Sequence, residues 1–177
     1  MLSLYFQQVN GLAPFATGLA FLPMMAIVMP ANLLAPRAAE RYGARAVIAA
    51  GSVLAALGCA GLAGIGHDTP YWALCAQLIA MGAGLGLLVP PLTSMLLGSV
   101  DKAHSGIAAG VLNSTRQSGS MLGVALFGAL ISGTGAFIGG ARAAAILSAL
   151  LLLAAAAAIM IGGHPHNPDR RVKPGNT

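Results

Sequence analysis

The sequence predicts an all-α protein, a polytopic transmembrane helix bundle with five full spans and a partial N-terminal span. Only 7% of the 177 residues are charged, and 57% are hydrophobic, whereas a soluble domain carries about 25% charged residues. The few charges also divide the chain into long apolar runs. So few charges cannot cover a surface that faces water, and we therefore expect the apolar surface to contact a lipid bilayer.

Each predicted full span is an apolar run of about the 20 residues that a helix needs to cross a bilayer. One span contains a single charge, Arg116, the last begins at Arg142, and the other three contain none. Glycines at 133, 135, 139 and 140 predict a loop after the fourth full span, and the polar composition of residues 164–177 predicts a disordered tail. The expected spans are 1–10 (partial), 12–35, 46–66, 70–97, 105–131 and 142–163.

Prolines and glycines inside the apolar runs predict bends and close helix contacts. Membrane helices accept proline because neighbouring groups satisfy the carbonyls that it frees, and we expect bends at Pro23, Pro30 and the pair Pro90-Pro91. Glycines four residues apart let helices approach closely. They include Gly106 with Gly110, and Gly119 with Gly123. The Gly-x-Gly-x-Gly pattern at 82–86 lacks a preceding strand and a following acidic residue, so it predicts helix packing and not a dinucleotide loop.

The basic residues predict the orientation of the chain, because cytoplasmic loops of membrane proteins carry an excess of Lys and Arg. Because each span crosses the bilayer, successive loops lie on opposite sides. This places seven basic residues on one side and only Arg142 on the other. We therefore expect a multi-pass protein of the cell membrane with a cytoplasmic C-terminus. The seven residues are Arg37, Arg41, Arg45, Lys102, Arg170, Arg171 and Lys173.

The most informative residue for function is Arg116, which lies about 15 Å along its span and therefore near the middle of a hydrocarbon layer of ~30 Å. An arginine at that depth costs about 2.5–3.5 kcal/mol, so it is expected to face other helices or a cavity. Asn113, Gln117 and Ser120 share its helix face. This stripe predicts the wall of a substrate cavity, to which Gln77 is the expected contribution of another span. The alternative is a structural role, in which Arg116 caps carbonyls of a neighbouring helix.

Several other functions find no support in the sequence. The acidic residues lie at the edges of the apolar runs, and no nucleophile–base pair or pair of carboxylates predicts an enzyme. His164 and His166 have no further ligand nearby, so we expect no metal site, and no cofactor is implied. The basic residues form no stripe with interleaved aromatics, which argues against nucleic acid. The acidic residues are Glu40, Asp68, Asp101 and Asp169.

The segment 36–45 resembles the cytoplasmic loop G-x-x-x-D-R-x-G-R/K-R/K of the major facilitator superfamily. Pro36 and Ala44 depart from the pattern, as suits the weaker second copy of this loop in the C-terminal half of such transporters. The span 105–131 contains no proline, whereas the fifth span of the antiporters usually carries a Gly-Pro-rich motif, which again favours the C-terminal half. The matching residues are Glu40 at the acidic position, Arg41, Gly43 and Arg45.

Two further stretches, 5–19 and 110–123, are similar to the fourteen-span drug:proton antiporter branch. The resemblance implies the C-terminal half of a secondary transporter that exports small amphipathic compounds or drugs by proton-coupled alternating access. Its implied partners are the missing N-terminal half, a small-molecule substrate and protons. It also implies that Arg116, Asn113, Gln117 and Gln77 line the cavity, and that Glu40, Arg41, Gly43 and Arg45 form a charge latch that favours one state.

Two alternatives stay open on the sequence alone. The chain is also compatible with a truncated remnant or an accessory membrane subunit without transport activity, because its first span is incomplete and it has no acidic residue at mid-membrane. A small channel built from two copies of the chain is the other alternative.

Overall fold

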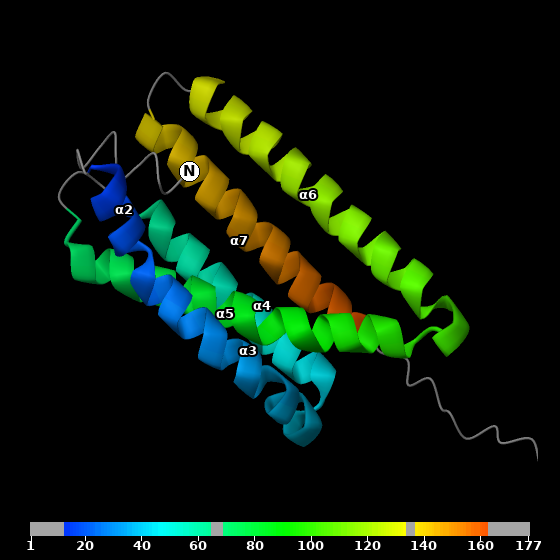
Figure 1. Ribbon diagram of the computed structural model, residues 1–177. Coiled ribbons are helices and arrows are strands. Elements are labelled where there is room, and N and C mark those ends of the chain that lie inside the picture. Colours follow the sequence, from blue (N-terminus) through cyan, green and yellow to red (C-terminus); the bar gives the residue numbers. More distant parts are fainter. Residues whose placement is uncertain (1–12, 65–68, 134–136, 163–177) are drawn as a thin grey trace, which may run out of the picture.

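Helices make up almost all of the computed structural model, which describes residues 13–64, 69–133 and 137–162, without the side chains of 102, 131–133 and 137–138. No strand occurs in these ranges, so the all-α prediction is confirmed. The helices are α2 (Pro14–Ala20), α3 (Leu22–Tyr42), α4 (Ala44–Ala63), α5 (Tyr71–Gly98), the 3-10 turn η1 (Lys102–His104), α6 (Ser105–Gly133) and α7 (Phe137–Ile161) (Figure 1).

Five long helical segments occupy the five predicted full spans. Four of them are long and apolar enough to cross a membrane, namely Pro14–Tyr42, Ala44–Ala63, Tyr71–Gly98 and Gly139–Ile161. The fifth, α6, is long enough with 29 residues, but the polar residues between Asn113 and Ser120 lower its hydropathy. The predicted partial span 1–10 and the predicted tail 164–177 lie outside the described residues.

Two predicted loops are shorter in the structure than in the sequence prediction. The helix expected to end at residue 35 continues through Pro36 to Tyr42, and α4 begins only two residues later. A 29-residue segment is about 43 Å long, so its last turns extend beyond the hydrocarbon layer and carry charges without leaving the helix. The predicted end of the loop over Gly133–Gly140 is also wrong, because α7 already begins at Phe137. Membrane helices accept glycine, so Gly139 and Gly140 did not mark a loop.

The prolines differ in their effect on the helices. The bend expected at Pro23 takes the form of an interruption, because α2 ends before Phe21 and Pro23 occupies the first turn of α3. Proline is favoured at this position because the first N–H groups of a helix have no partner within it. Pro30 lies inside α3, and Pro90 and Pro91 lie inside α5, which continues through both to Gly98.

The core is a close-packed layer in which α4 contacts α5 and α7 extensively and α5 also contacts α3 (Figure 1). Glycines bring these backbones together. A Cβ added to Gly51 of α4 would lie 2.8 Å from the carbonyl oxygen of Gly84, and one added to Gly82 would lie 2.9 Å from that of Met24 in α3. The packing role predicted for the glycines at 82–86 is therefore confirmed. Buried Ile48, Leu74 and Leu78 fill the remaining core.

Helix α6 lies at the edge of the bundle and packs mainly on α7. The close approach expected at its glycines does not occur within the described chain, because a Cβ at Gly106, Gly110, Gly119 or Gly123 would meet nothing within 4 Å. Large apolar side chains of α6 are also uncovered, with Met121 and Val124 each 72% exposed. The chain therefore leaves a long face of α6 available to lipid or to other helices.

The glycine contacts generate a stability prediction. Gly84→Ala in the 177-residue chain should lower its free energy of unfolding in lipid bicelles by about 1–3 kcal/mol, because the new methyl group meets backbone atoms of Gly51 and Ala55 that cannot move aside. Gly119→Ala, with open space around it, is the matched control and should be neutral or slightly stabilising. Equal destabilisation by both substitutions would contradict the packing role.

Candidate functional site

The polar stripe of α6 lies at the middle of this helix, as the spacing of its residues predicted. Asn113, Arg116, Gln117 and Ser120 are all exposed in the chain, and they lie on one face because they are three or four residues apart. Arg116 is 11 positions after Ser105, which starts the 29-residue helix. Arg116 therefore lies near the middle of α6, which among the described residues contacts mainly α7 and, to a lesser extent, α5 and η1.

Arg116 is fixed by a hydroxyl group of the neighbouring helix α5. Its Nη2 donates a hydrogen bond of 2.7 Å to Oγ1 of Thr93. The Thr93 hydroxyl donates in turn to the carbonyl oxygen of Val89, 2.9 Å away in the same helix, which leaves its oxygen lone pairs to accept from Arg116. The guanidinium therefore points toward α5, whereas Asn113, Gln117 and Ser120 are exposed.

Sequence reasoning missed Thr93. The sequence did contain a signal for it. A buried Arg116 needs a hydrogen-bond acceptor on a neighbouring helix, and all four acidic residues lie at the edges of the apolar runs. Only a hydroxyl, an amide or a carbonyl was left to serve. Thr93 and Ser94 follow Pro90-Pro91 on the preceding span, and their hydroxyls were candidates for that reason.

Gln77 does not lie with the other predicted cavity residues. Its carboxamide packs against α4 at Gly61, where an added Cβ would overlap it. It also lies more than four helical turns before Thr93, about 24 Å along the axis of α5. The structure brings Arg116 together with Thr93, and it places Gln77 at a different position along α5, against α4.

The four predicted latch residues lie around the junction of α3 and α4. Glu40 and Arg41 are in the last turn of α3, and Arg45 is in the first turn of α4. Gly43 joins the helices with a φ of 87° and a ψ of 139°, a positive-φ conformation that glycine adopts readily because it lacks a Cβ. The guanidinium of Arg41 lies 5.5 Å from the centre of the Tyr42 ring, a cation–π distance.

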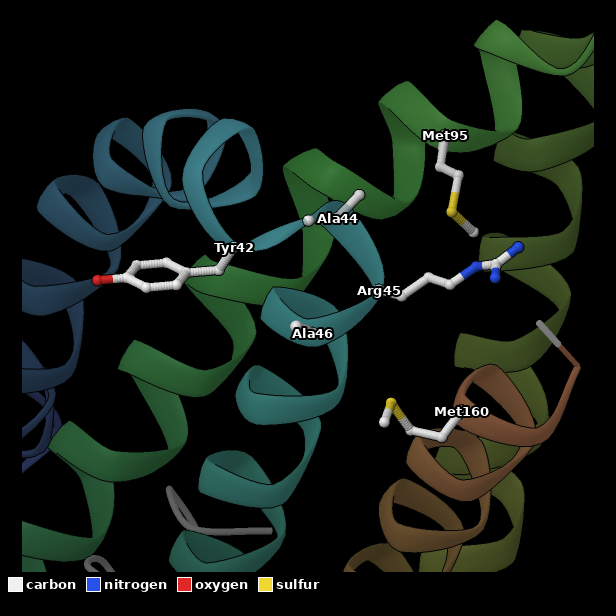
Figure 2. A pocket seen from close by; sticks show the side chains of 7 residues that line it. Tyr42, Ala44, Arg45, Ala46, Met95 and Met160 are labelled. Atoms are coloured by element: carbon white, nitrogen blue, oxygen red, sulfur yellow. The ribbon is translucent and has the colours of Figure 1, made fainter. Parts of the chain in front are cut away.

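Two cavities flank this junction and separate two of the latch residues. Glu40 lines a cavity of about 380 Å³ together with Pro90 and Pro91 of α5. Arg45 lines a second cavity of about 500 Å³ together with Met95 of α5 and Met160 of α7 (Figure 2). The two charged side chains thus border different spaces, and Ala44 and Met95 line both.

The chemistry that these residues offer is binding and positioning. Across residues 13–64, 69–133 and 137–162, no group of three or more His, Cys, Asp or Glu side chains is placed to hold a metal ion. Cys59 is buried against Ala56 and Ala149 in the core. A cation, amides and hydroxyls on an otherwise apolar helix are suited to recognising a polar group of a ligand inside the membrane.

Apolar helices of spanning length define an integral membrane protein. The chain belongs to the Major Facilitator Superfamily, whose family model matches residues 1–176. Transporters of this family are not enzymes, and the match confirms the resemblance carried by the segment 36–45. No solved structure matches the chain significantly.

The similar proteins have names that refer to drug resistance and efflux. The chain is 32% identical to the methylenomycin A resistance protein of Streptomyces coelicolor over 80% of the chain and 30% of that protein. It is 33% identical to the methylenomycin A resistance protein of Bacillus subtilis over 81% of the chain and 31% of the relative. It is 30% identical to the drug efflux pump JefA of Mycobacterium tuberculosis over 97% of the chain and 34% of that pump. The chain thus spans about a third of the length of these relatives.

The contact between Arg116 and Thr93 can be measured by a double-mutant cycle on unfolding in bicelles. Thr93→Val and Arg116→Gln should show a coupling energy of about 0.5–1.5 kcal/mol, the range of hydrogen bonds between membrane helices. Thr115→Val is the matched control for Thr93→Val, because the Thr115 hydroxyl bonds to Val111 in its own helix. A coupling of zero between Thr93 and Arg116 would show that the hydrogen bond does not hold α6 to α5.

Proposed function

We propose that this chain is the C-terminal half of a secondary active transporter that exports small amphipathic compounds by proton-coupled alternating access. Its membership in the Major Facilitator Superfamily supports transport. The names of its relatives, methylenomycin A resistance protein and drug efflux pump, support export of drug-like molecules. The chain spans only about a third of each relative, so the remaining helices belong to the rest of the transporter.

The observation that carries this proposal is the exposed polar stripe of α6. Arg116 is held by Thr93 at mid-membrane, while Asn113 and Gln117 on the same face are exposed. Polar groups facing lipid at this depth are costly, so the stripe requires a polar environment that this half of the bundle does not supply alone. A water-filled substrate cavity between two halves is such an environment.

The missing half supplies the remaining wall of the cavity and the proton carrier. The acidic residues of this chain lie at the edges of its apolar runs, so proton coupling requires a carboxylate elsewhere in the transporter. The latch residues act at the cytoplasmic end, where Glu40, Arg41 and Arg45 surround the sharp turn at Gly43 and favour one of the two states by their contacts with the other half.

Arg116→Ala should abolish drug efflux by a polypeptide that carries this chain together with the rest of the transporter, because it removes the cation from the cavity wall. Membrane insertion should persist, since the substitution makes α6 more apolar. Efflux of a fluorescent anionic or zwitterionic dye from cells measures the first effect, and the amount of protein in the membrane fraction measures the second.

Arg37→Ala is the control for this test, because it removes an exposed arginine from α3 outside the stripe and outside the latch. It should leave efflux within about twofold of the unaltered transporter. Normal efflux by Arg116→Ala would remove Arg116 from the cavity. No efflux by the unaltered pair of halves would favour an accessory subunit or a remnant without transport activity.

We further propose that the chain lies in the cell membrane with its C-terminus in the cytoplasm, on the basis of the excess of basic residues on one side. A green fluorescent protein fused after Thr177 should fluoresce, and alkaline phosphatase fused at the same position should be inactive, because the latter folds only after export. The opposite pair of results would reverse the orientation and place the latch outside the cell.

A further inference from the structure

The cavity at the start of α4 combines a positive charge with apolar walls. It has a volume of about 500 Å³, which lies within the range of about 300–1,000 Å³ that is usual for ligand sites. Three helix ends meet there, because Arg45 is the second residue of α4, Met95 lies in the last turn of α5 and Met160 lies in the last turn of α7. Figure 2 shows the Arg45 side chain extending toward the space between the two methionines.

The polar part of the cavity is suited to an anion. Arg45 already makes an interaction within the chain, but a guanidinium has five N–H donors and matches the geometry of a phosphate group. Ala44, Arg45 and Ala46 all line the cavity. These residues form the first turn of a 20-residue helix, and its N-cap, Gly43, makes no side-chain capping hydrogen bond. The helix dipole therefore adds to the positive charge of Arg45.

The apolar part of the cavity is suited to an acyl chain. Met95 and Met160 are 39% and 62% exposed, and methionine adapts its shape to flexible apolar partners. Both lie within one turn of the ends of helices that are long and apolar enough to cross a membrane. The cavity thus offers a cationic end and an apolar end across the membrane interface.

The neighbouring cavity differs from the Arg45 cavity mainly in the sign of its charge, and this difference decides which of the two can bind an anion. It shares Ala44 and Met95 with the Arg45 cavity, but Glu40 lines it and no basic residue does. A carboxylate repels a phosphate, so only the Arg45 cavity is complementary to an anion. Basic pockets between membrane helices on the cytoplasmic side are known to hold the headgroups of anionic lipids.

We propose that the cavity lined by Arg45, Met95 and Met160 binds one anionic phospholipid, with its phosphate on Arg45 and the first turn of α4 and an acyl chain along the two methionines. The assignment to the cytoplasmic leaflet rests on the proposed orientation, but the binding itself does not. An anionic lipid in this place bridges α4, α5 and α7 and neutralises one charge of the proposed latch.

Native mass spectrometry of the full 177-residue chain in detergent tests this binding. Titration with phosphatidylglycerol should give a dissociation constant about tenfold lower than titration with phosphatidylethanolamine of the same acyl chains. Arg45→Gln should weaken phosphatidylglycerol binding about tenfold. Met160→Trp, which fills the cavity and leaves every charge in place, should weaken it by a similar factor, and the exposure of Met160 makes this substitution compatible with folding.

Two matched controls keep the test specific. Arg37→Gln removes an exposed arginine and Met29→Trp enlarges an exposed methionine, and neither residue lines the Arg45 cavity. Both should leave the dissociation constant within about twofold. Equal binding of the two lipids, unchanged binding by Arg45→Gln, or equal affinity for glycerol phosphate without acyl chains would each overturn the proposal. The result does not depend on drug transport, so failure of the proposed function leaves this test intact.

Discussion

Lipid as the solvent is the constraint on which the rest of this structure depends. Hydrocarbon offers no hydrogen bonds, so every backbone group must be satisfied inside a helix. Apolar side chains gain little by leaving lipid for a protein interior, so the bundle is held by close van der Waals contact between backbones. The glycines of α4 and α5 provide that contact, because Gly51 and Gly84 approach so closely that neither tolerates a Cβ.

The same constraint explains why α6 differs from the other long helices. The contacts among α3, α4, α5 and α7 are close and apolar. Among the residues that the structure describes, the glycines of α6 have no neighbouring helix within 4 Å of the position of a Cβ, and its exposed polar residues would be costly in contact with lipid. A helix with both features is suited to a partner helix and to water. We propose that the remainder of the transporter supplies both, since the chain spans about a third of the length of its relatives.

Much of the fold could be predicted because charges are excluded from hydrocarbon. The five long helices follow from the runs between Arg37, Asp68, Asp101 and Arg142. The ends of the helices were harder to predict, because a membrane helix can continue past the bilayer, as α3 does through Pro36, and can accept glycines, as α7 does at Gly139. Proline and glycine often end helices in soluble proteins, but they do not fix the ends of these membrane helices.

The candidate site could be predicted only within one helix. The stripe around Arg116 follows from helical periodicity, which the sequence contains in full. The choice of Thr93 as its partner, and the contact of Gln77 with α4, depend on how α5 is rotated relative to α4 and α6. That rotation results from the packing of Gly82, Gly84 and Gly86 on two neighbouring helices at once, and no periodicity in a single span encodes it.

The energies indicate what the complete site must contain. An arginine at the centre of a membrane helix costs about 2.5–3.5 kcal/mol, and a hydrogen bond between membrane helices returns about 0.6 kcal/mol on average and at most about 1.7. Thr93 is neutral, so its bond to Arg116 leaves the full positive charge in place. The remaining cost, about 1–3 kcal/mol, must be offset by water in a cavity or by an anionic group. Because the acidic residues of this sequence lie at the edges of its apolar runs, we propose that such an anionic group comes from the other half of the transporter or from the molecule that it carries.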